Sequence, residues 1–129
     1  MTESDPIGPI EISVPAVASL SRVLRLAASG LASLAQRNVD VIEDIKIAVS
    51  EVFLALIEHG AGHTITVSLA FADETFSIIG RTRVDAFDLN HPDLILCRTV
   101  LAGVCARHSI DATNGFAEIL ASVGSGSGG

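Results

Sequence analysis

The stretch Val39–Gly60, VDVIEDIKIAVSEVFLALIEHG, is the longest helical pattern in this sequence of 129 residues. Its apolar residues recur at three- and four-residue spacing, which places them on one buried face of a helix. These residues are Ile42, Ile45, Val49, Val52, Phe53 and Leu56. Asp44, Glu51 and Glu58 fall on a polar stripe of the same helix, with Ala48 and Ala55 beside it. This polar stripe is the first candidate for a functional surface.

Patterns on either side of this helix predict a small α+β domain. We expect a strand at 10–14, a helix from 16 or 17 to about 36, strands at 64–72 and 75–83, a helix at 93–108, and a last strand near 115–122 that forms a hairpin with 110–113. In the first helix the expected inward residues are Val17, Leu20, Val23, Leu24, Ala27, Leu31 and Leu34. About three helices then cover one face of a mixed, mostly antiparallel sheet, which makes a two-layer α/β sandwich.

The ends of the chain differ in composition from its middle. Residues 1–9 contain Pro6, Gly8 and Pro9 and are expected to form a flexible leader. Residues 10–123 form the single predicted domain. The last residues, 124–129, read GSGSGG, which is the composition of a flexible linker and of tails left by cloning.

Charge and cysteine spacing narrow the class of protein. The net charge of −7 argues against nucleic acid as a partner, because phosphate binding needs clustered Lys and Arg. No apolar run approaches the ~18–20 residues of a membrane span. Cys97 and Cys105 are expected in one helix, about 12 Å apart along its axis, which is too far for a disulfide. We therefore expect reduced thiols and a cytoplasmic protein.

The segment DIKIAVSEVFLALIEH, residues 44–59, resembles the second helix of the serine-kinase anti-sigma factors. These proteins belong to the histidine-kinase-like (GHKL) ATPase superfamily. In that family a run close to D-[LI]-[KR]-[LI]-A-V-[SD]-E is followed by an Asn four residues after the Glu, and often by a later His. The order of predicted elements from residue 10 to 123 also fits. The resemblance implies the Bergerat, or histidine-kinase-like ATPase, fold, in which the Glu is a general base and the Asn binds magnesium on the nucleotide.

Three features that this family uses to bind nucleotide are altered here. Glu51 matches the general base, but Ala55 stands at the Asn position, and a methyl group supplies no oxygen ligand for magnesium. In the second family motif, Thr82 replaces the adenine-reading Asp and Val84 replaces a Gly. Residues 90–95 contain no glycine that would let backbone amides approach a triphosphate. We therefore expect an eroded ATP site and no bound cofactor.

The resemblance then implies a non-catalytic regulatory protein that binds a sigma factor, a STAS-type anti-anti-sigma protein, or both. Candidate partner-binding residues are Asp44 and Glu58 on the polar stripe, and Asp85, Phe87 and Asp88 in the following loop. Because the family is commonly dimeric, a homodimer is also expected.

Two other interpretations remain open. The chain could be a divergent serine-protein kinase that uses ATP and magnesium, with Glu51 as general base. Alternatively, the pocket vacated by ATP binds another small ligand, or Phe87 and Leu89 fill it.

The histidines do not form a clear metal-binding pattern in the sequence. His59 and His63 are close in sequence, but they would lie at a helix end and in a loop, without the Cys or carboxylate ligands that zinc sites usually add. No metal site is predicted. His59 is expected to interact with the negative end of the helix dipole, and His91 and His108 are expected to be isolated structural residues.

Overall fold

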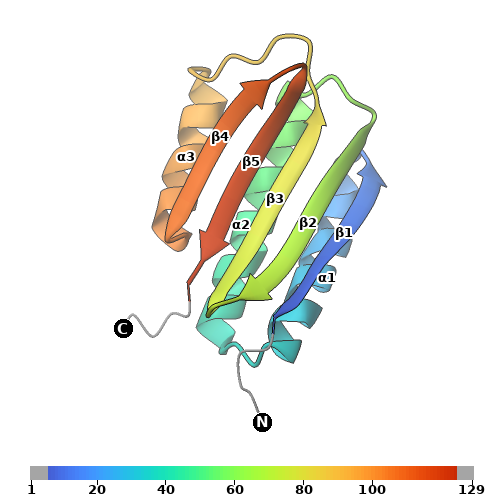
Figure 1. Ribbon diagram of the computed structural model, residues 1–129. Coiled ribbons are helices and arrows are strands. Elements are labelled where there is room, and N and C mark those ends of the chain that lie inside the picture. Colours follow the sequence, from blue (N-terminus) through green and yellow to red (C-terminus); the bar gives the residue numbers. More distant parts are fainter. Residues whose placement is uncertain (1–5, 125–129) are drawn as a thin grey trace.

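The computed structural model of the protein describes residues 6–124 and has two layers, a sheet and a set of helices (Figure 1). The elements in chain order are β1 (Ile7–Pro15), a 3-10 turn (Ala18–Leu20), α1 (Ser21–Leu34), α2 (Val39–His59), β2 (Thr64–Ala72), β3 (Thr75–Arg83), α3 (Pro92–Val104), β4 (Arg107–Thr113) and β5 (Phe116–Val123). All three α-helices lie on the same face of the sheet. The predicted two-layer α+β sandwich is confirmed.

The sheet has five strands in the order β1-β2-β3-β5-β4, and every neighbouring pair is antiparallel. The sheet is thus wholly antiparallel in the described part of the chain, where a mixed one was expected. Two tight turns make its hairpins. Asp73 and Glu74 join β2 to β3 with φ of 54° and 63°, and Asn114 and Gly115 join β4 to β5 with φ of 56° and 80°. Positive φ at both turn residues matches the twist of the paired strands.

α2 lies across the middle of the sheet and supplies much of the core. Asn38 begins it, because its side-chain Oδ1 accepts a hydrogen bond from the Val41 amide at 2.9 Å. Its buried face contains Ile45, Val49, Val52, Phe53 and Leu56, as the spacing predicted, together with Val41 and Ala48. Gly80 of β3 lies directly beneath it. A Cβ at that position would lie 2.5 Å from Val52 Cγ1 and 2.7 Å from Leu56 Cδ1, so glycine allows the close approach of helix and strand.

The buried face of α1 differs from the prediction. Leu24 and Leu31 are buried as expected, but Ala28, Ala32 and Ala35 accompany them. Val17, Val23 and Leu34 were expected inside and are exposed, with 72% of Leu34 accessible. The apolar side of α1 is wider than the face that its neighbours bury, so spacing alone did not fix the buried face. Small alanines let it pack closely against its neighbours.

Two predicted boundaries are also wrong. β1 begins at Ile7, so residues 7–9 belong to the sheet and not to a flexible leader: Ile7 pairs with Phe71 before a register shift that leads to Ile10. The third helix ends at Val104 rather than His108, because the chain turns into β4 at Arg107. Residues 1–5 and 125–129, which hold most of the predicted leader and tail, lie outside the described part.

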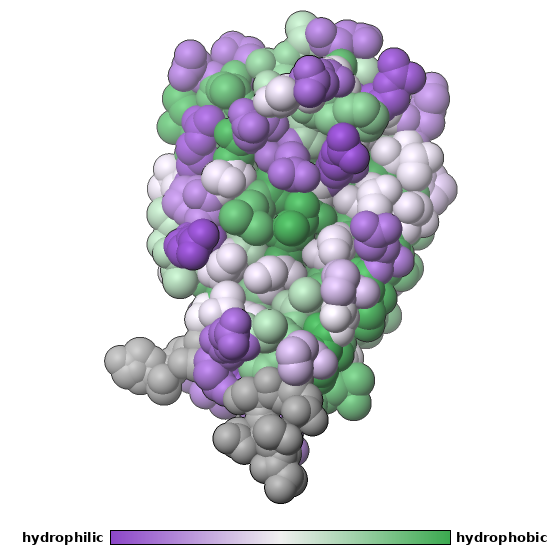
Figure 2. All heavy atoms as spheres, viewed as in Figure 1, coloured by the Kyte–Doolittle hydropathy of each residue, from purple (hydrophilic) through white to green (hydrophobic). Residues whose placement is uncertain are grey.

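The outer face of the sheet carries no helix and faces the viewer in Figure 2. A small apolar centre is surrounded there by polar side chains. Ile79 and Leu120, which are half-buried cross-strand neighbours on β3 and β5, alternate with residues that face the helices. No helix within residues 6–124 is long and apolar enough to cross a membrane. Both cysteines are free, as expected.

Candidate functional site

The polar stripe of α2 faces α3 along part of its length. Glu51, Ala55, Glu58 and His59 line a cavity of about 170 Å³ between the two helices, and Asp93, Leu96 and Cys97 of α3 line it from the other side. Asp44 is half-buried and lies outside this cavity, while Glu58 is exposed. The structure therefore brings Glu51 and Glu58 together and leaves Asp44 apart.

Glu51 has an environment different from that of a solvated surface carboxylate. It is half-buried, and loss of solvent raises its pKa above the ordinary value. Its backbone oxygen lies 3.9 Å from the Sγ of Cys97, in a weak contact with the thiol. Burial, with a smaller contribution from the nearby Glu51 carboxylate, raises the pKa of Cys97 to about 11. Both effects favour the neutral forms, so Cys97 is not an activated nucleophile.

Ala55 lies on the cavity wall one helical turn after Glu51. This is the position at which the resemblance implies the magnesium-binding Asn. The alanine methyl offers no ligand, so within this cavity the carboxylates of Glu51, Glu58 and Asp93 are the oxygen donors.

Thr82, at the position of the adenine-reading Asp, takes part in the packing of the sheet. It is 3% exposed, and its Oγ1 donates a hydrogen bond to the backbone oxygen of Thr64 at 3.0 Å. A Cβ at Gly60 or Gly62 would lie within 2.6 Å of the Thr82 side chain, so the chain after α2 packs directly on it. This side chain is thus committed to structure and leaves no carboxylate to read a base.

The loop between β3 and α3 divides the remaining predicted partner-binding residues. Asp85 and Asp88 are exposed, and Asp88 Oδ1 accepts a hydrogen bond from the Asn90 amide at 2.9 Å. Phe87 is half-buried and meets the ring of His59 edge-on, with 6.3 Å between ring centroids. Phe87 therefore packs toward the end of α2, whereas the two aspartates face outward.

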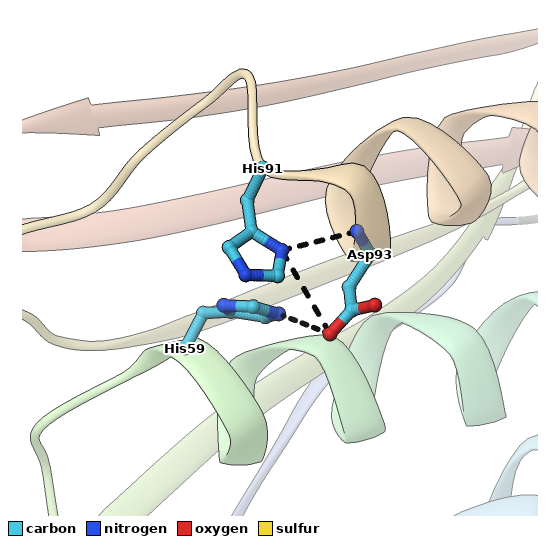
Figure 3. A group of neighbouring side chains, drawn as sticks. All are labelled: His59, His91 and Asp93. Carbon is cyan, nitrogen blue, oxygen red and sulfur yellow. Dashed lines mark hydrogen bonds and ion pairs between the residues drawn. The ribbon is translucent and has the colours of Figure 1, made fainter.

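His59, His91 and Asp93 converge where α2 ends and α3 begins (Figure 3). The ring centroids of His59 and His91 are 4.6 Å apart, and the Oδ2 of Asp93 lies 3.5 Å from His59 Nε2. The expectation that His91 is isolated is wrong. His63 does not join this group, because it is exposed and borders the outer face of the sheet. The missed signal was His-Pro-Asp at the start of a helix, which placed two ligand-type side chains near the end of α2.

A larger depression, of about 760 Å³, lies on the outer face of the sheet, where Thr66, Ile79, Arg81 and Phe116 contribute to its lining. It contains none of the side chains singled out above as catalytic or partner-binding. We therefore place the candidate site between α2 and α3.

Comparison with known proteins supports the resemblance. No protein-family model matches the chain. This chain is 35% identical over 83 residues to the serine-protein kinase RsbW of Halalkalibacterium halodurans. The aligned segment covers 63% of this chain and 51% of the relative. It is 36% identical over 85 residues to the serine-protein kinase RsbW of Bacillus licheniformis, over 63% of this chain and 53% of the relative. The chain is similar to RsbW. The aligned part spans about half the length of these curated relatives.

The fold has a solved counterpart. A crystal structure of the RsbU and RsbW domains of a Mycobacterium tuberculosis protein matches with a TM-score of 0.71 at 19% identity, over 91% of this chain and 32% of that one. At this identity the match concerns the fold alone, and it agrees with the histidine-kinase-like fold predicted from the α2 motif. The resemblance named from that motif is confirmed.

Proposed function

We propose that this protein is a non-catalytic regulator of the anti-sigma type, which binds a sigma factor and is released by a STAS-type antagonist that competes for the same surface. It would act in the cytoplasm and as a homodimer. The similarity to RsbW and the shared fold support the class of protein. The altered site between α2 and α3 supports the absence of catalysis.

The main observation in support of a non-catalytic protein is the size and lining of that site. The cavity measures about 170 Å³, whereas pockets that hold small molecules usually measure about 300–1,000 Å³. Ala55 supplies no magnesium ligand on its wall, and Phe87 packs toward His59 at its end. The small cavity and the missing magnesium ligand support a site that does not hold a nucleoside triphosphate.

Exposed apolar side chains on the helical layer offer a surface for a protein partner. Leu54 of α2 and Leu96 of α3 both line the cavity and are 36% and 62% exposed, and Ile95, next to Leu96 in the sequence, is 50% exposed. Glu58 and Asp93 add negative charge at the rim. An apolar centre with a charged rim is typical of protein interfaces and suits a partner with basic residues around an apolar contact.

Binding measurements with the purified protein test this proposal. We expect calorimetry to show no magnesium-dependent ATP binding, and pull-down from the native cell to recover a sigma factor or a STAS protein. Leu96→Asp should weaken capture by more than about tenfold, because it charges the centre of the surface. Gln36→Asp, exposed beyond the end of α1, is the matched control and should bind normally. Recovery of neither a sigma factor nor a STAS protein would refute the proposal. Sedimentation velocity separately tests whether the protein is a homodimer.

A second candidate function is serine-protein kinase activity, which the names of the relatives favour. Glu51 lines the cavity and has a raised pKa, as a general base acting near neutral pH requires. The test is transfer of radiolabelled phosphate from ATP and magnesium to the captured STAS protein. Transfer that disappears in Glu51→Gln would establish the kinase and end the non-catalytic proposal. Absence of phosphate transfer while partner binding is retained supports the non-catalytic proposal.

A further inference from the structure

The junction of α2 and α3 gathers three metal-ligand side chains that the proposed function does not use. His59 is the last residue of α2, His91 directly precedes α3, and Asp93 lies in its first turn. One ligand atom of each lies within 4.8 Å of the others. In Figure 3 both imidazole rings approach the same carboxylate oxygen of Asp93.

The two distances from Asp93 are close to those between ligands of one ion and are too long for strong ion pairs. Asp93 Oδ2 lies 3.5 Å from His59 Nε2 and 3.8 Å from His91 Nδ1. A charged hydrogen bond between such groups measures about 2.7–2.9 Å. Two ligands at about 2.0–2.1 Å from a tetrahedral zinc ion lie about 3.3 Å apart. The three ligand atoms here lie up to 4.8 Å from one another, so the side chains have to draw together around the ion.

His59 presents a nitrogen that needs a partner. Its Nε2 is buried and has no hydrogen-bond partner among the described residues, and its side chain is 16% exposed. A buried nitrogen without a partner costs free energy. A bound cation would give this nitrogen the partner it lacks.

His91 Nδ1 already has a hydrogen-bond partner, which an ion at this nitrogen would replace. Its Nδ1 accepts a hydrogen bond from the Asp93 amide at 3.1 Å and thereby caps α3. A neutral imidazole that accepts at Nδ1 carries its proton at Nε2, and Nδ1 has a single in-plane lone pair, so a cation bound at Nδ1 takes the place of this hydrogen bond. His91 and Asp93 are 42% and 57% exposed in their side chains, so an ion can reach them from solvent.

The surroundings favour positive charge. Asp93 and His59 also line the cavity that contains Glu51 and Glu58, and the described residues of this lining include no Lys or Arg. Nearby carboxylates lower the energy of a cation there.

We propose that His59 Nε2, His91 Nδ1 and Asp93 Oδ2 bind one zinc-class divalent cation. Two imidazole nitrogens and one carboxylate suit zinc and its neighbours, whereas magnesium prefers an all-oxygen shell. Three protein ligands leave a fourth position for water at the mouth of the cavity. The ion joins the end of α2 to the start of α3 and fixes the loop between β3 and α3. The inference rests on these three side chains and not on the proposed regulatory function.

Zinc titration of chelator-treated protein against a chromophoric competitor tests the site. We expect one zinc per chain, with affinity lowered more than about tenfold in His59→Ala and in Asp93→Asn, since changes to outer-shell partners alone commonly cost 10–100-fold. His91→Asn keeps a good helix cap and removes the imidazole, so it should lose affinity while its metal-free melting temperature stays near wild type.

The controls are histidine and cysteine variants outside the cluster. His63→Ala and His108→Ala should bind zinc like wild type, and so should Cys97→Ser, because its thiol has a raised pKa and lies outside the cluster of ligand atoms. Absence of stoichiometric binding at millimolar zinc would overturn the proposal. So would binding that survives in His59→Ala or that disappears in Cys97→Ser.

Discussion

Replacing Gly80 by alanine should destabilise the protein, although alanine is the smallest possible addition. The new Cβ would lie 2.5 Å from Val52 Cγ1 and 2.7 Å from Leu56 Cδ1, both on the buried face of α2. Leu56 can move its terminal methyl, but valine in a helix has one strongly preferred rotamer and cannot turn away. Relief therefore requires α2 to move away from β3 along the centre of the core.

Overpacking of this kind costs about 1–3 kcal/mol. For a domain of this size it corresponds to a fall in melting temperature of roughly 4–12 °C. The measurement is thermal and urea unfolding followed by circular dichroism. Val52→Ala in the same chain removes the clashing methyl, so the double variant should lose less stability than the two single variants together.

Gly30→Ala is the matched control, because it is the same substitution in open space. Gly30 is exposed in α1, and a Cβ there would meet nothing within 4 Å. Alanine is favoured over glycine within a helix by about 0.5–1 kcal/mol, so this variant should be more stable than wild type. A Gly80→Ala variant as stable as wild type, or shifts of the same sign in both variants, would refute the packing described for β3 and α2.

Two further predictions concern the start of α2 and the thiols. Asn38→Ala should lower the free energy of unfolding by about 0.5–2 kcal/mol, because the Val41 amide loses its acceptor. Asn38→Ser keeps a side-chain acceptor and should retain most of the stability. Equal losses of stability for the two variants in urea unfolding would contradict the cap. Burial raises the pKa of both Cys97 and Cys105 to about 11, so at pH 8 both should react with a disulfide reagent roughly 100-fold more slowly than in the unfolded chain. The neutral thiols stabilise the fold fully below the ordinary pKa of 9.0 and lose that effect as pH rises toward 11; replacing both by serine should flatten this decline in melting temperature.

Helices and hairpins whose signals lie within one short segment of the chain could be predicted from the sequence. α2 has strict spacing, an Asn before its first turn and a Gly after its last residue, and both of its ends agree with the structure. The hairpins also follow from local turn residues. α1 shows the limit, because its apolar side is wider than its buried face and only contacts with α2 and the sheet select Ala28 and Ala32 over Val23.

Only the part of the candidate site that lies within one chain segment could be predicted from the sequence. Glu51 and Ala55 belong to one motif and were identified together, and the structure places both on the cavity wall. His59 and His91 are 32 positions apart in the sequence and meet only because α3 packs beside α2. His63 is nearer to His59 in the sequence, but it is exposed and borders the outer face of the sheet.

The two outer strands of the sheet bear on how this protein avoids aggregation. β1 contains Pro9 and Pro15, which have no amide hydrogen, and its register shifts between Ile7 and Ile10. β4 carries exposed charges at Arg107 and Asp111. Prolines, bulges and charges at sheet edges all oppose the addition of another strand. Fibril-like stacking through either edge is therefore disfavoured, and assembly with other chains is directed to the helices or the open face of the sheet.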